Sequence, residues 1–216
     1  YQIIRRKYTI NEKNFKVLDS NLVKNGNEVY YLGEKVNIKN PEKFEIIENY
    51  LSSPSMVVYG KDDKNVYLFN KRANGIDAKT FEKINGRSYL DNKYYRDKNN
   101  VYYFSEDKML KMENADRNSV NELSKNILRD KNNVYFENKQ IKGLDINSIK
   151  VIYENGISEP ENLIKDKNGV YYIDENKKTL IKFRNDEIDI ESFGIANEML
   201  DDYFKDKNNV YYLEEY

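Results

Sequence analysis

Cysteine and histidine are both absent from the 216 residues. Without them the chain can form no disulfide, zinc–thiolate site, cysteine nucleophile or imidazole base. The sequence has no phosphate-binding glycine pattern, and Ser52-Ser53-Pro54-Ser55 lacks the glycines of a nucleophile elbow. These absences remove most common enzyme and cofactor classes, so we predict no catalytic residue, no cofactor and no metal site.

Two further features are missing. No apolar run approaches the roughly 20 residues that a membrane-spanning helix requires. Basic and acidic residues number 36 and 37 and are mixed along the chain, and the longest cationic run is only Arg5-Arg6-Lys7. Because phosphate contacts need clustered Lys and Arg, we predict no nucleic-acid partner. The chain begins at Tyr1 rather than Met, so a leader or lipid anchor could have been removed.

Aromatic side chains are what the sequence has in quantity, with 20 Tyr and 9 Phe residues. Each buried ring contributes roughly 1.5–3 kcal/mol by area bookkeeping. A disordered chain would lack them. We therefore predict a folded protein.

The strongest pattern is a recurring phrase, which reads Asp-Lys-Asn-Asn-Val-Tyr-Tyr at residues 97–103 and 206–212. Its valine recurs at positions 29, 66, 101, 134, 170 and 210, at steps of 33 to 40 residues. Such a period indicates a tandem array of one small unit. We predict a single repeat domain over residues 1–216 with about six units. Their hairpins are expected near residues 22–32, 59–69, 94–104, 127–137, 163–173 and 203–213.

Each phrase is typical of a β-hairpin. Asp suits the first position of the turn, because its carboxylate can accept hydrogen bonds from the amides ahead of it. The last turn position is expected to adopt positive φ, which Asn and Gly tolerate. The residues found there are Asn65, Asn100, Asn133, Gly169 and Asn209, whereas the first copy has Glu28. The Val-Tyr-aromatic run that follows predicts a strand, and a third short strand comes after a second turn.

A second element recurs between hairpins: an Asp or Asn followed four residues later by a large apolar residue. Asp or Asn favours a helix N-cap, which predicts one or two turns of helix closed by a hydrophobic staple. A further apolar residue three positions on is the expected helical partner, and a fourth strand is the alternative. The copies lie at Asn11–Phe15, Asn40–Phe44, Asp77–Phe81, Asp116–Val120, Asp145–Ile149 and Asp189–Phe193.

The predicted fold is therefore mainly β, with tandem antiparallel β-meander repeats and short helical turns. One unit alone would be marginally stable, so stacking of neighbours must supply the core. We expect an open curved array, because the spacing is short and uneven for propeller blades. A closed six-bladed propeller is the alternative, since Ile3–Tyr8 and Val210–Leu213 together could complete one unit.

The phrases at Asp97–Tyr103, Asp166–Tyr172 and Asp206–Tyr212 resemble the bacterial DKNYY repeat family. The Asp-x-x-Ser/Thr-Phe element at Asp77–Phe81 and Asp189–Phe193 is also similar to that family. The resemblance implies a protein of the cell envelope or a secreted protein, since the family is often attached to exported bacterial proteins. It brings no established catalytic residues.

One tyrosine recurs just after the valine in every unit and is never replaced by Phe. The simplest interpretation is that each ring packs while its hydroxyl bonds backbone or carboxylate in the adjoining unit. Alternatively, the rings form a ladder of platforms that contact a glycan or an extended peptide. These candidate ligand-contact residues are Tyr30, Tyr67, Tyr102, Tyr135, Tyr171 and Tyr211.

Two other kinds of site have weaker support. The turn Asp166-Lys167-Asn168-Gly169 begins like a calcium loop, but no bidentate Glu follows at the required distance. Paired carboxylates such as Asp201-Asp202 or Asp62-Asp63 could serve glycoside hydrolysis, although acidic residues are too frequent for such pairs to be informative.

We therefore expect a non-enzymatic repeat protein that presents a binding or scaffolding surface to a protein or glycan at the bacterial cell envelope. The alternative is an intracellular inhibitor or immunity-type protein that binds another protein. A carboxylate-dependent hydrolase is the third hypothesis.

Overall fold

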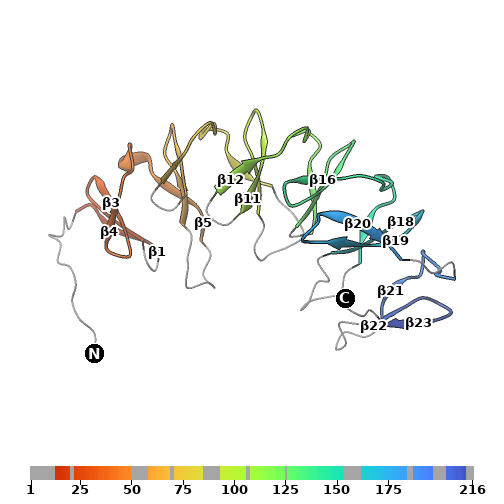
Figure 1. Ribbon diagram of the computed structural model, residues 1–216. Helices are drawn as coiled ribbons and strands as arrows, with labels where there is room; N and C mark the ends of the chain where they lie inside the picture. The colour runs from red at the N-terminus through yellow and green to blue at the C-terminus, as the bar shows by residue number, and fades with distance from the viewer. Residues whose placement is uncertain are drawn as a thin grey trace, which may run out of the picture. The chain divides into compact units, whose positions relative to one another are not determined.

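The computed structural model describes residues 13–19, 22–49, 58–68, 71–84, 93–105, 108–124, 126–152, 162–183, 187–196 and 203–212. These residues form six small antiparallel sheets, and none of the sheets closes into a barrel (Figure 1). The prediction of a mainly β protein built from tandem meander repeats is confirmed. The choice between an open array and a closed ring stays a prediction.

Every sheet contains strands that follow one another in the sequence. The first sheet contains β1 (Phe15–Asp19), β2 (Leu22–Asn25), β3 (Glu28–Tyr31) and β4 (Glu34–Val36). The second contains β5 (Glu45–Asn49), β6 (Val58–Lys61), β7 (Val66–Leu68) and β8 (Lys71–Ala73). The third contains β9 (Glu82–Lys83), β10 (Tyr94–Arg96), β11 (Val101–Ser105) and β12 (Lys108–Lys111).

The remaining three sheets repeat the same order. The fourth contains β13 (Asn121–Ser124), β14 (Ile127–Arg129), β15 (Val134–Phe136) and β16 (Lys139–Ile141). The fifth contains β17 (Lys150–Val151), β18 (Leu163–Asp166), β19 (Gly169–Asp174) and β20 (Thr179–Lys182). The sixth has three strands in the described part of the chain: β21 (Gly194–Ile195), β22 (Tyr203–Lys205) and β23 (Val210–Tyr212).

The recurring phrase forms the turn between the second and third strands of each full sheet. In the second sheet, Tyr59 pairs with Leu68 and Lys61 with Val66 across this turn. The chain divides into two compact units: residues 1–83 with 95–110, and residues 84–94 with 111–216. The expectation of a single repeat domain stays a prediction.

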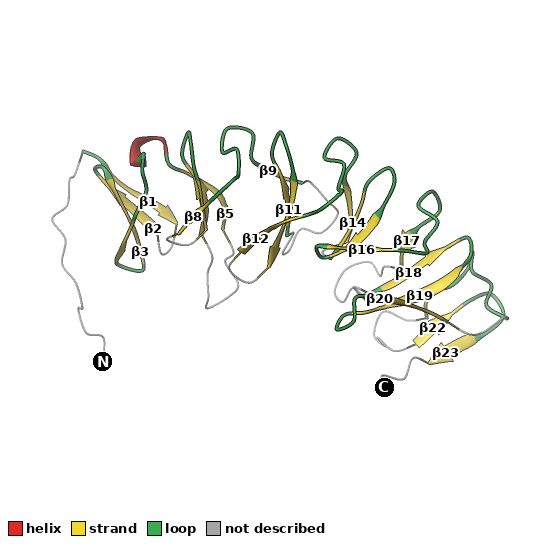
Figure 2. Cartoon of the chain, turned by 45° about the horizontal axis from the view of Figure 1, so that its top comes forward, coloured by secondary structure: helices red, strands yellow, loops and turns green. Residues whose placement is uncertain are grey.

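The short turn and the fourth strand, which the sequence left as alternatives, both occur and follow one another. At Asp77 the backbone makes one turn, with the Thr80 amide donating to the Asp77 carbonyl at 3.2 Å, and β9 then begins at Glu82. In the preceding copy the turn is the 3₁₀ helix η1 (Pro41–Lys43), drawn red in Figure 2. Phe44 ends it with extended backbone, at φ −70° and ψ 128°. We call the turn before each first strand the linking turn.

The apolar residue expected as a helical partner lies instead in or after the first strand. The pairing register shifts between Val17 and Asp19, between Ile46 and Glu48, and between Glu122 and Ser124. Each shift is a β-bulge, which adds a residue and re-aims its side chain. The bulged residues are Leu18, Ile47 and Leu123, and all three pack on core clusters.

The core lies between successive sheets, because period-2 geometry sends neighbouring side chains of a strand to opposite faces. In the second sheet, Tyr67 packs on Leu22 and Val29 of the first sheet. Its neighbours Val66 and Leu68 pack in a cluster that includes residues of the third sheet. The recurrent valine therefore faces the following sheet, and the recurrent tyrosine faces the preceding one.

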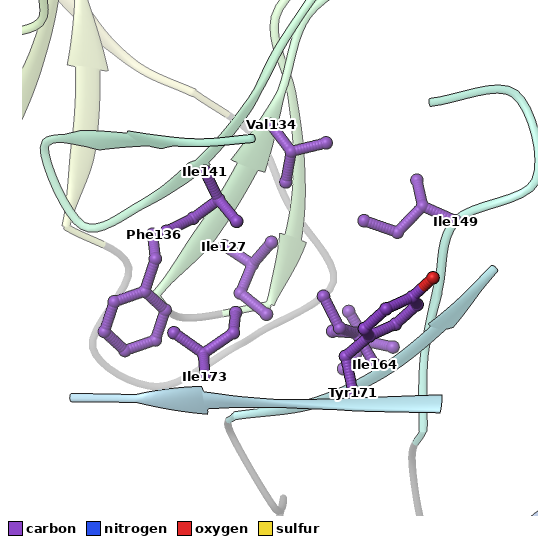
Figure 3. Close-up of a cluster of buried hydrophobic side chains, with 9 residues drawn as sticks. Ile127, Val134, Phe136, Ile141, Ile149, Ile164, Tyr171 and Ile173 are labelled. Atoms are coloured by element: carbon purple, nitrogen blue, oxygen red, sulfur yellow. The ribbon is translucent and has the colours of Figure 1, made fainter. Parts of the chain in front are cut away.

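The same arrangement holds in the second compact unit. Val134 and Phe136 of the fourth sheet share a cluster with Tyr171 and Ile173 of the fifth (Figure 3). Val170 of the fifth sheet shares the next cluster with Phe204 of the sixth. Each sheet thus completes its core only against a neighbour, as expected for repeats that are too small to fold alone.

The expected positive φ at the end of the hairpin turn is wrong. Asn65, Asn100, Asn133, Gly169 and Asn209 are described residues, and none of them has positive φ. The turn Asp closes the loop through its side chain, so no left-handed residue is needed. Positive φ occurs at other positions, among them Gly75 (79°), Asn114 (65°) and Gly143 (94°), each two residues before a linking turn, and Gly26 (62°) in the hairpin turn of the first copy.

Candidate functional site

Five of the six recurrent tyrosines are buried. Tyr67 and Tyr135 are each 1 % exposed, and Tyr211 of the last sheet is half-buried. The others, Tyr30, Tyr102 and Tyr171, are 8 % exposed or less. This placement favours the packing interpretation, and contact of these rings with a ligand stays a prediction.

The hydroxyl of each recurrent tyrosine lies beside an acidic side chain of its own hairpin. Tyr67 donates to Asp62 Oδ2 at 2.6 Å and accepts the backbone amide of Lys39 at 2.9 Å. Corresponding bonds to the turn Asp are made by Tyr102, Tyr135 and Tyr211, at 2.8, 3.1 and 2.7 Å. The first copy has no turn Asp, and there Tyr30 donates to Glu28 instead. Sequence reasoning anticipated the carboxylate partner but placed it in the adjoining unit.

Burial and the adjacent carboxylates make these phenols weaker acids. Burial is the larger cause and Asp62 the second in raising the pKa of Tyr67 to about 12. Burial together with Asp97 raises the pKa of Tyr102 in the same way. These hydroxyls therefore remain protonated donors at neutral pH.

The turn Asp is the centre of the network, as the copy at Asp97 shows. Its Oδ1 accepts the amides of Asn99 at 2.7 Å and Asn100 at 2.8 Å, which closes the hairpin turn. Its Oδ2 accepts the Tyr102 hydroxyl and the amide of Asp77, the first residue of the linking turn, at 2.8 Å each. One buried carboxylate thus fixes the hairpin turn, the strand after it and the linking turn.

The hairpin turns of the second, fourth, fifth and sixth sheets make the same bond to the linking turn. Asp62, Asp130, Asp166 and Asp206 accept the first amide of their linking turns through Oδ2 at 2.6–3.1 Å. The donors are Asn40, Asp116, Asp145 and Asp189. Each of these linking turns is therefore bonded to the hairpin of the sheet that it introduces. We call the turn Asp, together with the backbone amides and the tyrosine hydroxyl that donate to it, the lock.

A second set of contacts surrounds this lock. Lys98 forms an ion pair with Asp77 at 2.9 Å, and its backbone amide donates to Thr80 Oγ1 at 2.9 Å. Thr80 in turn donates its hydroxyl to Asp77 Oδ1 at 2.7 Å. The equivalent triads are Asp116, Ser119 and Lys131; Asp145, Ser148 and Lys167; and Asp189, Ser192 and Lys207.

The contacts made by Asp97 and Asp189 favour the charged form of these two carboxyl groups. Burial alone would raise the pKa of Asp97, but the Asp77 and Asn99 amides and the Tyr102 hydroxyl hold it below the ordinary value. Lys207 and then Ser192 lower the pKa of Asp189 to about 2. A carboxylate committed to such donors is a poor general acid.

A basic residue just before the turn Asp makes contacts with the next linking turn. Lys165 Nζ donates to the backbone carbonyls of Glu191 at 2.9 Å and Phe193 at 2.6 Å. Lys61 donates to the Phe81 carbonyl, and Arg129 to that of Ile146, in the same manner. Burial lowers the pKa of Lys165. These cations join one sheet to the next.

The candidate metal and hydrolytic residues are accounted for as far as the structure describes them. Asp166 accepts the amides of Asn168 and Asp145, so both of its oxygens have protein donors. Over the described residues, no group of three or more acidic side chains is placed to hold a metal ion. Asp62 lies in the lock, and Asp63 accepts the side-chain amide of Asn40. Asp201, Asp202 and Ser52–Ser55 lie outside the described residues.

Sequence reasoning missed the partnership between the two recurrent elements. Lys98, Thr80 and Asp77 were each visible as recurring residues, yet Lys98 follows Thr80 by 18 residues and Asp77 by 21, and no local rule pairs it with them. The available signal was their joint occurrence: the copies with Lys directly after the turn Asp also have Asp and Ser or Thr in the linking turn. Two copies depart from this pattern: the second changes both members together, to Asn40 and Asp63, and the first has Asn11 and Gly26 at these positions.

In the described ranges no helix is long and apolar enough to cross a membrane. No curated protein and no solved structure matches the chain. The sequence model of the DKNYY family matches residues 36–106, 59–125 and 94–216, which together cover most of the chain. The matched regions contain the hairpin turns and linking turns of the second to sixth sheets. The chain belongs to the DKNYY family.

Proposed function

We propose that this protein is a non-enzymatic repeat protein that presents a binding or scaffolding surface to a protein or glycan at the bacterial cell envelope. The observation that carries the proposal is the use made of the recurring polar residues. The Asp, Tyr, Ser or Thr, and Lys side chains of the repeat bond to one another or to backbone, as at Asp97, Tyr102, Thr80 and Lys98. Repetition of these residues therefore serves the fold rather than a reaction.

The surface available to a ligand lies at the tips of the hairpins. The third residue of each Asp-Lys-Asn turn is exposed, and its backbone, not its side chain, bonds the turn Asp. These tips are Asn99, Asn132, Asn168 and Asn208. Amide side chains repeated at the same position in four units suit a partner with repeated polar groups, such as a glycan or an extended polypeptide.

A binding experiment tests this assignment. Glycan arrays and pull-downs from envelope extracts are compared for the unaltered chain and for a variant with all four tip Asn residues changed to Ala. We expect the variant to lose binding while its melting temperature is retained, because the tip backbone still closes each turn. Tyr102→Phe is the matched control and should lower the melting temperature without a binding defect. If Tyr102→Phe lost binding and the tip variant did not, the tyrosines rather than the tip Asn residues would contact the ligand.

Location in the cell separates this proposal from an intracellular inhibitor. Antibody detection after fractionation of the producing bacterium should place the protein in the envelope or the medium. Detection only in the cytoplasmic fraction, with a cytoplasmic protein captured by pull-down, would favour the inhibitor.

A further inference from the structure

Among the described residues, one face of the sixth sheet has four exposed side chains. Tyr203 pairs with Tyr212, and Lys205 pairs with Val210, so these four side chains lie on the same side of the sheet. All four are exposed, and the two tyrosine rings contact each other with centroids 5.0 Å apart. We call these four residues the tail face. On the opposite side, Phe204 and Tyr211 pack against the fifth sheet.

The equivalent face of the fifth sheet is covered by the sixth sheet and can be compared with the tail face. The same register places Leu163, Lys165, Val170 and Tyr172 on one side of that sheet. Val170 is 2 % exposed under the sixth sheet, whereas Val210 at the equivalent position is 68 % exposed. The Lys and Val are the same residues at both sites, and Tyr172 corresponds to Tyr212. The tail face therefore has the composition of the covered side of the fifth sheet, although its own side chains are exposed.

The opposite half of such a joint is present on the first sheet. The sixth sheet contacts the fifth through Phe193, Ile195, Phe204 and Tyr211. Counted from the linking turn and the hairpin turn, the equivalent positions on the first sheet are Phe15, Val17, Val23 and Tyr30. We call these four residues the head face.

The head face is a continuous side of the first sheet. Val17 pairs with Val23, and Val23 pairs with Tyr30, so these side chains adjoin one another. The adjacent bulged residue, Leu18, instead packs into the core with the second sheet. Phe15 is 40 % exposed and Val17 is 67 % exposed. Val23 is half-buried and Tyr30 is buried, so the exposed apolar part of the head face consists of Phe15 and Val17 on β1.

Exposed apolar residues are concentrated on these two faces. Seven large hydrophobic side chains are exposed among the described residues, and five of them belong to the head or tail face. The other two are Leu32 and Ile181. Exposed patches of this kind mark interaction sites in soluble proteins.

We propose that copies of this chain associate head to tail, with the tail face of one copy packed on the head face of another. The joint repeats the contact between the fifth and sixth sheets. Lys205 of one copy donates to the Lys13 and Phe15 carbonyls of the next, as Lys165 donates to those of Glu191 and Phe193. Linking turns are bonded to their own hairpins, through the turn Asp in the second to sixth sheets and through the Gly26 amide and Asn14 carbonyl, 3.2 Å apart, in the first. This joint therefore requires no covalent connection between the copies. Because the two faces differ, the contact is heterologous and can extend beyond a dimer.

The test uses two variants that each disable one face: Val210→Asp for the tail and Val17→Asp for the head. The unaltered chain should show concentration-dependent association in analytical ultracentrifugation. An unpaired carboxylate buried in the joint should weaken association by at least about tenfold in either variant. Each variant alone should therefore be monomeric at concentrations where the unaltered chain associates.

Mixing the two variants is the decisive step, because each retains one intact face. We expect the mixture to form 1:1 dimers and nothing larger. A mixture that stays monomeric, or a variant that associates as the unaltered chain does, overturns the proposal. So does an unaltered chain that is monomeric at all concentrations, which is the result expected for a ring closed within one chain.

Two further variants serve as a control for the added charge and as a second test of the tail face. Leu32→Asp introduces the same charge at an exposed residue outside both faces and should associate normally. Tyr212→Glu places a carboxylate at a second exposed position of the tail face and replaces Val210→Asp if that variant does not fold. Circular dichroism and melting temperature establish that each variant is folded before the mixing experiment is interpreted.

Discussion

The second and third sheets use different residues where the linking turn packs on the second strand. In the third sheet, Phe81 of the linking turn stacks on Tyr95 of β10, with ring centroids 5.4 Å apart. In the second sheet, the residue equivalent to Tyr95 is Gly60, and the Phe44 ring occupies the space that a side chain there would need. The contact between the linking turn and the second strand of the sheet thus requires that the volume be filled. It does not require an aromatic ring on both the linking turn and the strand.

The locks of these two sheets differ in a similar way. Asp97 and Asp62 make the same bonds to the amide that opens the linking turn and to the recurrent tyrosine. Around this shared centre, the third sheet has the pair Asp77–Lys98 and the second has Asn40–Asp63. The buried carboxylate is therefore the constant part, and the outer pair can be exchanged as long as its two members complement each other.

The largest effect is expected from removing the buried carboxylate. Asp97→Ala leaves the amides of Asp77, Asn99 and Asn100 without their acceptor and should lower the free energy of unfolding by about 3–5 kcal/mol. Asp97→Asn should cost less, because its amide oxygen can still accept from the turn while its amide nitrogen cannot accept from Asp77. Urea unfolding measures both. Equal and small losses for the two variants would contradict a central role for Asp97.

A smaller loss is expected at Gly60. A Cβ there would lie 2.2 Å from the Phe44 ring, so Gly60→Ala must displace that ring from the core. Overpacking of this kind costs about 1–3 kcal/mol. The double variant Gly60→Ala with Phe44→Ala should be less destabilised than the sum of its parts, since the clash is gone. Strict additivity in urea unfolding would show that the two residues do not share this space.

The recurrent tyrosines should differ by how deeply the acidic partners of their hydroxyls are buried, since Asp62 is 3 % exposed and the Glu28 side chain is 41 % exposed. Tyr67→Phe removes the acceptor of the Lys39 amide as well as a donor to Asp62, and should cost about 1–2 kcal/mol. Tyr30 bonds the half-exposed Glu28, so Tyr30→Phe should cost about 0.5 kcal/mol or less. Thermal unfolding of both variants gives the comparison. The reverse order would contradict the assigned partners.

The sequence predicted the repeat, its strands and its buried rings, because these follow from local patterns. Val66-Tyr67-Leu68 is a strand by composition, and alternation sends Tyr67 to the opposite face from its neighbours. The shape of the turn could not be predicted in this way: Asn100 was expected to adopt positive φ, yet the Asp97 carboxylate closes the loop without it. The pairing of Asp77 with Lys98 depends on tertiary contact between segments that are distant in the sequence, which no local preference encodes.

Acid should weaken the lock through Asp97. Its pKa is lowered in the folded state, so the stabilisation is present above the ordinary carboxyl pKa of about 4 and is lost as pH falls through the folded value. The free energy of unfolding should therefore fall more steeply below about pH 4 in the unaltered chain than in Asp97→Asn. Urea midpoints measured from pH 6 to pH 3 test this. Parallel curves would mean that Asp97 does not titrate differently on folding.

The smallest effect, and the sharpest test of the comparison, comes from converting the lock of the second sheet into that of the third. Asn40→Asp alone places a carboxylate beside Asp63 and should lower the free energy of unfolding slightly. Adding Asp63→Lys should recover the loss by forming the pair seen at Asp77–Lys98, with a coupling of about 0.3–1 kcal/mol because the pair is largely exposed. The coupling should shrink in high salt, since exposed ion pairs are screened. A coupling near zero at low salt would mean that the outer pair contributes only geometry, and that the buried carboxylate of Asp62 carries the lock alone.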